Sequence, residues 1–339
     1  MLLLSRSSSY LASKAGEGKR SHELVPGMLL CGFLCLSVIL FKVAVVIGTP
    51  LELDAGSQIA LFGLGVVPAV GAMIYSHPRR FQPRMASLYF TVALVPFSAL
   101  AFANLGHVVS YLSRSQPFWD HLLAWGDAAL GFDWIAMLRW ANEHPVLTAL
   151  AYGVYMSAGF QSLMVPILLA GLGRYRVLQV SVIALLLTLI VTYGIAWLLP
   201  ALGTYDFYGI DPSQHPNITV RVASLHVPEI MGVRDGSILN ISRLAPTGLI
   251  TFPSFHAANA VLLAWALWHV PYLRYPALIL NSLMLVATPL HGSHFLVDVL
   301  AGILSAALAI ATAAILLTGL QRLWQQSESI PLIHSPSEL

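Results

Sequence analysis

Long apolar runs restrict the fold of this chain more than any other feature of its sequence. A helix needs about 20 consecutive, mostly apolar residues to cross a lipid bilayer. Only 9% of the 339 residues are charged, against about 25% in a soluble domain, so the surroundings must be largely lipid. Eight apolar runs fall near residues 27–49, 58–76, 87–110, 145–170, 178–200, 255–270, 275–290 and 295–320. We predict an all-α fold, a polytopic membrane helical bundle with about eight transmembrane helices, in which the short sixth or seventh could be partly re-entrant.

The segment between residues 111 and 144 differs from the spans around it. It combines four tryptophans with three aspartates, namely Trp119, Trp125, Trp134, Trp140, Asp120, Asp127 and Asp133. This mixture is typical of an amphipathic helix that lies in the membrane interface, so we do not count it as a span. The connection 201–254 is too long to be a simple link. It predicts a cap or substrate-binding element over the outer ends of the helices.

Lysine and arginine are divided unequally between the two sets of loops. Eleven fall on one side together with both chain ends, namely Arg6, Lys14, Lys19, Arg20, Arg79, Arg80, Arg84, Arg174, Arg176, Arg274 and Arg322. The opposite loops hold Arg114, Arg139, Arg221, Arg234 and Arg243, while Lys42 lies within the first span. Cytoplasmic loops carry the excess of Lys and Arg, so both termini are predicted to be cytoplasmic. Loops 111–144, 201–254 and 291–294 would then face the periplasm, lumen or exterior.

The net charge limits the possible partners and the N-terminus suggests on which side the chain begins, whereas the two cysteines carry no information on the redox compartment. The net charge is +2 and the basic residues are scattered, so no patch could follow a phosphodiester backbone and nucleic acid is not an expected partner. Cys31 and Cys35 lie four residues apart in an apolar run, where they are expected to pack as small hydrophobic side chains. The polar, basic N-terminus is interpreted as a mature cytoplasmic tail that precedes an uncleaved anchor.

Ionisable side chains gather at two helix starts on the predicted outer side. In TFPSFHAANA, Ser254 can cap the sixth span and His256 lies in its first turn. In HGSHFLVDVLAG, His294 and Asp298 are four residues apart and therefore share a face of the eighth span. Both helix starts are good places to hold phosphate, because unpaired N–H groups and the positive end of the macrodipole attract anions. An aspartate one turn away can fix the histidine tautomer, which leaves the other ring nitrogen free as a nucleophile or base.

Two simpler uses of these residues compete with catalysis. A single histidine in an apolar protein is usually a packing or interfacial residue, and His256 is explained almost as well in that way. Asp298 is different, because an unpaired carboxylate at the centre of a span costs about 2.5–3.5 kcal/mol. Zinc is the second alternative, with His291, His294, Asp298 and His256 as ligands. Neither a His-Glu-x-x-His helix nor a nearby cysteine supports zinc, so we predict no metal and no other cofactor.

Three short motifs stand in order in the C-terminal half: PSFH from Pro253, HFLVD from His294 and LAG from Leu300. Together they resemble the type 2 phosphatidic acid phosphatase superfamily, in particular its branch similar to inositol phosphorylceramide synthase. GDAALGFDW from Gly126 and RDG from Arg234 look like the same branch. The resemblance covers about residues 120–302, whereas the first three spans add only topology. In the last motif, Gly302 is expected to allow a close approach of two helices.

The resemblance implies roles for individual residues. His294 would attack the phosphoryl group, Asp298 would orient it, and His256 would protonate the leaving group. Ser254 would help to hold the phosphate, and His291 would touch phosphate or headgroup, or else lie in the polar rim. The implied substrate is a phospholipid, a sphingolipid or a polyprenyl phosphate, with water or a polyol headgroup as acceptor.

The sequence departs from the superfamily at one important place. Phosphatase-type members carry a Ser-Arg pair upstream of the last histidine, but Ala287 and Thr288 stand here. A phosphoryl group in transfer needs a nearby positive charge, so Arg234 or Arg243 of the outer loop would have to supply it. That either arginine is simply a solvated charge on the loop is nearly as good an interpretation. This departure favours the phosphotransferase-like branch.

These observations lead to one organisation and two functional hypotheses. We expect a cytoplasmic tail at 1–25, additional transmembrane helices at 26–115, a catalytic membrane domain at 116–320 and a second tail at 321–339. The first hypothesis is a lipid phosphatase or phosphotransferase that works at the outward membrane face through a phosphohistidine intermediate. The alternative is a transporter or lipid-binding membrane protein that uses the His/Asp cluster for protons or headgroups. Because the cluster lies at helix ends rather than at the bilayer midplane, the enzyme is favoured.

Overall fold

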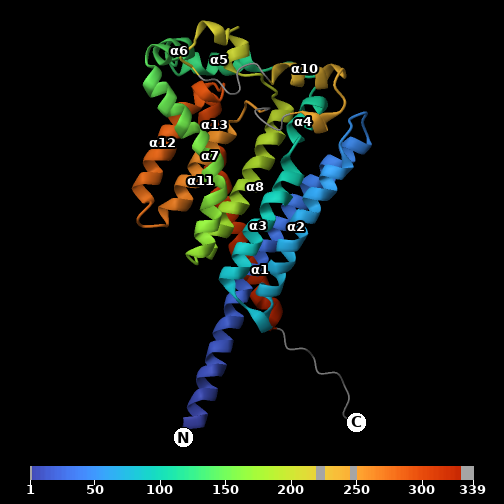
Figure 1. The fold of residues 1–339 in the computed structure, drawn as a ribbon, viewed down its shortest axis with the longest axis vertical. Helices are drawn as coiled ribbons and strands as arrows, with labels where there is room; N and C mark the ends of the chain where they lie inside the picture. The colour runs from blue at the N-terminus through green and yellow to red at the C-terminus, as the bar shows by residue number, and fades with distance from the viewer. Residues whose placement is uncertain (1, 219–225, 245–249, 330–339) are drawn as a thin grey trace.

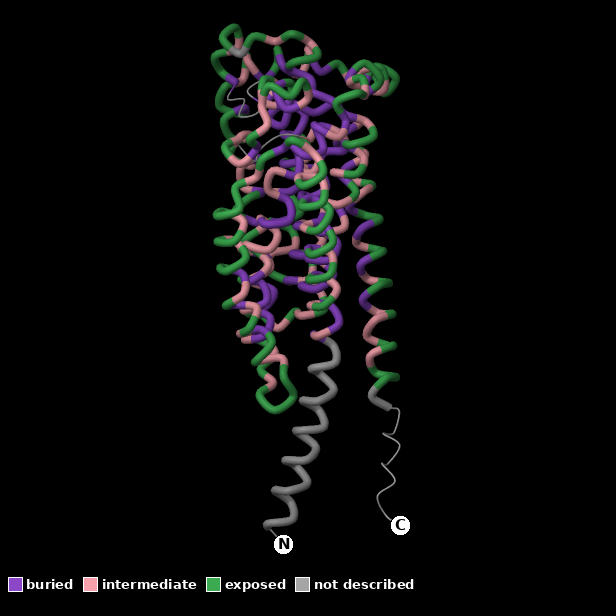
Figure 2. Tube along the Cα trace, turned by 90° about the vertical axis from the view of Figure 1, so that its right-hand side faces the viewer, coloured by how far each residue is buried: buried purple, intermediate pink, exposed green. Residues whose placement is uncertain are grey.

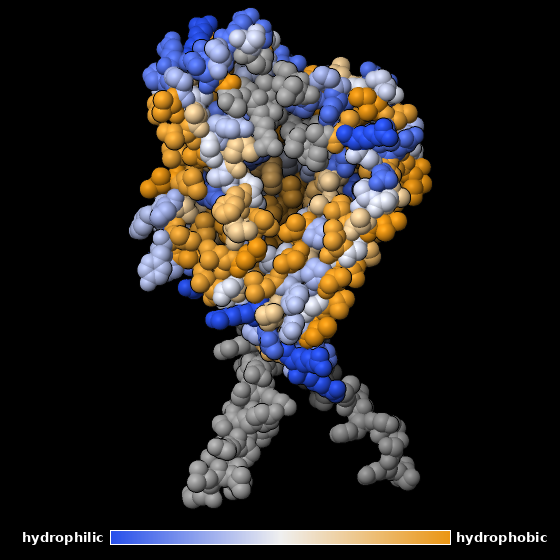
Figure 3. Space-filling model, viewed as in Figure 1, coloured by the Kyte–Doolittle hydropathy of each residue, from blue (hydrophilic) through white to orange (hydrophobic). Residues whose placement is uncertain are grey.

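The computed structural model describes residues 2–218, 226–244 and 250–329. Within these ranges every regular element is helical, and the single β-type contact is an isolated bridge between Glu52 and Asn240. On the face drawn in Figure 3, hydrophobic side chains cover the middle, between two more polar ends. The predicted all-α membrane bundle is therefore confirmed.

Within the described ranges, six helical segments are long and apolar enough to cross a membrane. They are Leu24–Ile47 within α1 (Leu2–Ile47), α2 (Ala55–Ser76), Pro83–Leu112 with α3 (Pro83–Phe102) and α4 (Leu105–Leu112), α7 (Pro145–Gly171), α8 (Tyr175–Leu198), and Leu296–Ser327 within α13 (Leu296–Ser329). The other two predicted spans form a hairpin of shorter helices, α11 (Phe255–Trp268) and α12 (Arg274–His291). At 1.5 Å per residue α11 extends about 21 Å, which is less than the roughly 30 Å of a hydrocarbon core. Length and hydropathy together thus support six of the eight predicted spans.

Helices α8 and α13 run through the middle of the bundle, where each contacts both α1 and α11. Helices α1 to α3 lie on one side of this pair, and α7, α11 and α12 lie on the other (Figure 1). Buried residues concentrate in the interior and towards one end of the molecule (Figure 2). Exposed apolar side chains such as Ile59 and Val67 face outwards from α2, as expected of a surface in contact with lipid.

The buried end of the bundle is covered by short helices. Helices α5 (Asp120–Ala129), α6 (Trp134–Glu143) and α10 (Val227–Asp235) lie over it (Figure 1). The predicted interfacial segment is therefore two short helices, α5 and α6, rather than one. Helix α9 (Thr204–Phe207) and the 3-10 helices η2 (Pro212–Gln214) and η3 (Ile241–Arg243) complete the long connection, whereas η1 (Pro78–Arg80) joins α2 to α3. Connections 111–144 and 201–254 thus share one end of the bundle, which we call the cap end.

Lys42, predicted within the first span, is buried among polar partners. Its ammonium group donates to the Gln58 side chain (3.2 Å) and to the carbonyls of Leu100 and Ala103. These carbonyls lie where Asn104, with a left-handed φ of 60°, separates α3 from α4. A charge inside a membrane protein needs such partners, so Lys42 ties α1 to α2 and to the break between α3 and α4.

Candidate active site

Helices α11 and α13 begin beside each other at the cap end. The Ser254 N–H donates to the Asp298 carbonyl at 3.0 Å. One turn further along α13, Gly302 faces the Ser254 carbonyl so closely that a Cβ atom on Gly302 would clash with it. The close helix approach predicted at Gly302 is therefore present. Two motifs that are 40 residues apart in the sequence lie side by side because of it.

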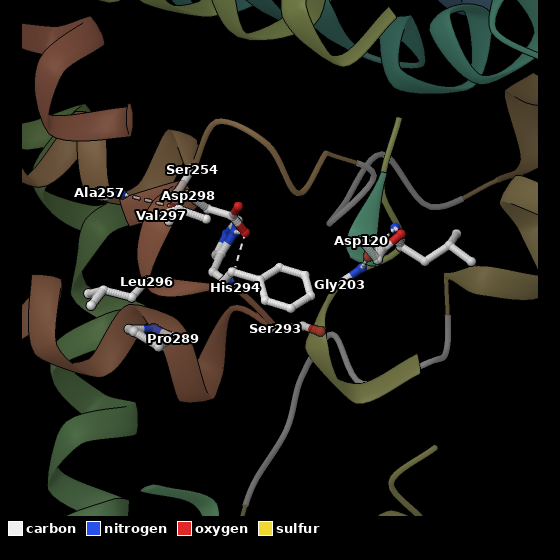
Figure 4. A network of polar contacts seen from close by, with 12 residues as sticks. Asp120, Gly203, Ser254, Ala257, Pro289, Ser293, His294, Leu296, Val297 and Asp298 are labelled. Carbon is white, nitrogen blue, oxygen red and sulfur yellow. Dashed lines mark hydrogen bonds and ion pairs between the residues drawn. The ribbon is translucent and has the colours of Figure 1, made fainter. Parts of the chain in front are cut away.

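His294 and Asp298 form a buried pair at the start of α13 (Figure 4). The Nδ1 atom of His294 lies 3.3 Å from Oδ2 of Asp298. The same carboxylate oxygen accepts the Phe295 N–H at 2.9 Å. Oδ1 of Asp298 is buried and has no hydrogen-bond partner among the described residues. The contact predicted from the four-residue spacing is thus present in the structure.

Burial controls the protonation of His294. It lowers the pKa of the imidazole to about 4, and a hydrogen bond with the Thr251 backbone opposes this shift. The ring is therefore neutral at pH 7. A neutral imidazole keeps one lone pair, which is the state that a nucleophile or a general base requires.

The N-terminus of α13 is already occupied by carboxylates. The N–H groups of Leu296 and Val297 donate to the two oxygens of Asp127, both at 2.9 Å. The preceding N–H, that of Phe295, donates to Asp298. We expected both helix starts to hold phosphate, and the structure corrects this expectation for α13. Its first N–H groups are engaged by side chains of α5 and of its own first turn.

The start of α11 is capped by Ser254, as its sequence predicts. The Ser254 hydroxyl accepts the Ala257 N–H at 3.3 Å, and its carbonyl accepts the Ala258 N–H at 3.1 Å. His256 lies in the first turn of this helix. Because the α13 start is occupied, the first turn of α11 is the better candidate for holding a phosphoryl group.

Tyr155 of α7 brings the other two candidate histidines together. Its ring stacks on His256 with centroids 4.3 Å apart and planes inclined by 17°. It also lies 6.2 Å from the ring of His291, which packs edge-on against Tyr152 at 5.5 Å. His291 is buried at the end of α12. The sequence analysis missed Tyr155, because a tyrosine inside an apolar run belongs to no recognisable motif.

Arg234 is engaged with the backbone between α4 and α5. Its guanidinium donates to the Ser113 hydroxyl (3.1 Å) and to the carbonyls of Arg114 (3.3 Å) and Gln116. The same group lies 4.3 Å from the centre of the Phe118 ring. Arg234 therefore anchors α10 to the cap end.

The second candidate arginine has different surroundings. Arg243 is exposed in η3, which is held to the α1–α2 connection by the hydrogen bond from the Ile241 N–H to the Glu52 carbonyl (3.1 Å). Arg234, in contrast, lines a small cavity of about 20 Å³ together with Thr251. Arg234 therefore shares a cavity with Thr251, whose backbone bonds to His294, whereas Arg243 does not line that cavity.

Two further aspartates, Asp120 and Asp127, are buried at the cap end, where Asp127 binds backbone N–H groups of the first residues of α13. Burial raises the pKa of Asp120 and of Asp127, and the backbone N–H groups that each carboxylate accepts oppose the shift. The sequence analysis assigned both residues only to an interfacial helix. Among the described residues, no group of three or more His, Cys, Asp or Glu side chains is placed to hold a metal ion.

The part of the chain that forms this site matches a known protein family. A family model described as the PAP2 superfamily matches residues 121–312, more than half of the chain. The matched segment extends from α5 into α13 and contains both histidine motifs. No curated protein and no solved structure matches the chain.

Proposed function

The chain belongs to the PAP2 superfamily, and from this premise we propose that it is an integral-membrane enzyme that hydrolyses or transfers a phosphoryl-linked lipid headgroup. The observation that carries the proposal is the pair formed by His294 and Asp298, held beside the first turn of α11. The distribution of Lys and Arg supports a reaction at the outward membrane face.

In the proposed first half-reaction, neutral His294 forms a nitrogen–phosphorus bond while the bond from phosphorus to the leaving oxygen breaks. His256 supplies the proton that the leaving oxygen needs. Asp298 stabilises the ring as positive charge develops on it. When it attacks, the His294 ring would give up its hydrogen bond with the Thr251 backbone and bind phosphorus instead.

In the second half-reaction an oxygen nucleophile gives its proton to His256 and attacks phosphorus, which breaks the nitrogen–phosphorus bond and returns both histidines to their starting forms. Water as nucleophile gives a lipid phosphatase, whereas a polyol gives a phosphotransferase similar to inositol phosphorylceramide synthase. The residues at the positions of the Ser-Arg pair support the phosphotransferase. Ala287 and Thr288 are buried inside α12, and the Thr288 hydroxyl donates to the Met284 carbonyl at 2.7 Å.

Contacts to the phosphate are part of the same proposal. Ser254 and the first turn of α11 would hold the phosphoryl oxygens, and His291 would contact phosphate or headgroup. Arg234 would give cationic support after exchanging one of its backbone contacts for phosphate. Arg243 is the weaker candidate, because η3 is bonded to the α1–α2 connection. Phospholipids, sphingolipids and polyprenyl phosphates are the proposed substrates.

Turnover by purified protein tests the proposal. Each lipid class would be offered with and without inositol, and products would be separated by mass. We expect His294→Ala to lower the rate by about 10³-fold or more, because removal of a nucleophile leaves only binding and polarisation. His269→Ala is the control, since His269 caps the opposite end of α11. Turnover that survives His294→Ala unchanged would exclude the histidine mechanism and leave the transporter or lipid-binding hypothesis.

A further inference from the structure

Helix α5 buries two of its aspartates and exposes two large apolar side chains. Asp120 and Asp127 are seven residues apart, about two helical turns, so they lie on one side of α5. Both are buried against the bundle, whereas Leu122 and Trp125 on other sides are 44% and 69% exposed. Burying a carboxylate is costly unless it accepts hydrogen bonds. The partners of the two aspartates therefore indicate what this helix does.

Asp127 engages the backbone that follows His294. Its two oxygens accept the N–H groups of Leu296 and Val297, each at 2.9 Å. The neighbouring Gly126 is needed for this fit, because a Cβ atom there would lie 2.9 Å from a methyl group of Val297. Asp127 thus caps α13 from a different helix, directly after the candidate nucleophile.

Asp120 acts on Ser293, the residue that precedes His294, through the segment 202–205. It accepts the N–H groups of Leu202 (3.0 Å) and Gly203 (2.7 Å; Figure 4). The next two N–H groups of that segment, those of Thr204 and Tyr205, donate to the carbonyl (3.2 Å) and to the hydroxyl (3.3 Å) of Ser293.

Ser293 needs this support because of its backbone conformation. Its φ is 59°, which is unfavourable for a residue other than glycine and persists only where neighbouring contacts impose it. Gly203 packs so tightly here that a Cβ atom on it would lie 2.5 Å from the Ser293 carbonyl oxygen. Ser293 immediately precedes His294, so a change at Ser293 turns the histidine.

We infer that Asp120 and Asp127 are positioning residues that clamp the two backbone segments flanking His294 and so fix the orientation of its ring towards Asp298. The effect on catalysis rests on the function proposed above. A displacement of about 1 Å in a reacting group can cost roughly 10²-fold in rate. The clamp therefore acts on the chemical step more than on substrate binding.

The test uses Asp127→Asn and Asp120→Asn in the full-length protein. Asparagine has nearly the same size, but its NH₂ group cannot accept an N–H. Asp133→Asn is the matched control, because Asp133 caps α6 through the Ala136 N–H (2.9 Å) and touches neither flank of His294. Three quantities are measured: kcat and KM for the lipid substrate, amide hydrogen exchange of the peptide containing residues 293–299, and the ring nitrogen chemical shifts of His294.

We expect Asp127→Asn to lower kcat by about 10- to 100-fold with KM changed by less than about threefold. Exchange at Leu296 and Val297 should accelerate and the His294 resonance should shift. Asp120→Asn should produce the same kinetic pattern through Ser293, and it serves as the second variant if Asp127→Asn fails to fold. Asp133→Asn should leave all three quantities unchanged.

Two results would overturn the inference. Faster exchange with unchanged kcat would mean that the clamp does not position the histidine, and reduced kcat with unchanged exchange and chemical shift would mean that Asp127 acts in another way. If the wild-type protein turns over no phosphorylated lipid, the proposed function fails by itself. Hydrogen exchange and the His294 chemical shifts of the two variants then still test whether the aspartates position His294. Unaltered chemical shifts in both variants would refute the inference.

Discussion

At the scale of single residues, the protonation of His294 is set by its surroundings. A neighbouring carboxylate ordinarily favours the imidazolium form, whereas burial disfavours any charge. Burial is the larger effect here and brings the pKa of His294 to about 4. The imidazole is therefore neutral before a substrate arrives, and in the proposed mechanism no proton has to be removed from it before it attacks phosphorus.

This shift predicts an unusual pH dependence. Because the pKa of His294 lies below the ordinary value of 6.5, the ring stays neutral in the interval in which an exposed histidine becomes charged. We expect kcat/KM, which reports the free enzyme, to be insensitive to His294 protonation between pH 7 and 5 and to fall near pH 4. Initial rates measured from pH 4 to 8 at constant ionic strength check this. The prediction would be contradicted if kcat/KM fell on acidification with a midpoint near pH 6.5 and this fall remained when each of the other histidines was replaced.

The same experiment needs a stability control. Between about pH 6.5 and 4 the unfolded chain binds the proton that native His294 does not bind. Acidification therefore lowers the free energy of unfolding in this interval, and the contribution is fully restored above pH 6.5. Enzyme incubated at each pH and assayed again at pH 7 separates this loss from a reversible effect on the rate.

At the scale of helices, polar side chains hold the short hairpin in place. Apolar surfaces do not drive helices together in lipid, so packing and interhelical hydrogen bonds must do so. Asn281 of α12 donates to the Gln161 side chain of α7 at 3.1 Å, and Asn259 of α11 donates to the Ser162 hydroxyl of α7 at 2.8 Å. Helix α7 thereby fixes both α11, which carries His256, and α12.

The contact between α11 and α13 gives a prediction at this scale. A Cβ atom at Gly302 would meet the Ser254 carbonyl and Ala257, so Gly302→Ala must push the start of α11 away from His294. We expect a loss of stability of about 1–3 kcal/mol, as for other overpacked sites, together with a lower kcat. Thermal unfolding in detergent and turnover measure the two effects. Gly319→Ala is the control on the same helix, because an added Cβ there meets no atom within 4 Å; equal effects of the two changes would contradict the prediction.

At the scale of the whole molecule, the cap end collects the described parts of the loops 111–144, 201–254 and 291–294 that the charge distribution assigned to the outside. The start of α13 and helices α5, α6 and α10 lie there together (Figure 1), while η1 with Arg79 and Arg80 lies at the other end of α2 from the α1–α2 connection. One orientation therefore suits the cap-end loops and η1 together. This internal agreement supports the proposed outward face of the site.

Cysteine labelling tests that orientation. Cys31 and Cys35 are buried, so the unmodified chain should give little background with a membrane-impermeant maleimide. Ser213→Cys, exposed in the cap-end connection, should react in intact cells. His77→Cys, exposed between α2 and α3, should react only after the membrane is permeabilised. The opposite pattern would reverse the predicted topology and move the site to the cytoplasmic face.

Local composition and periodicity were enough to determine the lipid environment, the long spans, the cap at Ser254 and the contact between His294 and Asp298. A four-residue spacing on a helix places two side chains together whatever the rest of the chain does. Length alone could not decide whether α11 and α12 cross the membrane. The 14 residues of α11 are too few for the usual criterion, whereas the 18 residues of α12 lie at its lower limit.

Only the tertiary structure decided which groups surround the histidine pair. The bonds from Leu296 and Val297 to Asp127 join residues about 170 positions apart in the chain, and the stack of Tyr155 on His256 joins two helices. Backbone N–H groups are the same at every residue except proline, so the sequence carries no sign of which carboxylate will accept them. The packing of α5 against α13 places Asp127 where it accepts these N–H groups. They are therefore not available for the anion that the sequence of α13 alone suggests.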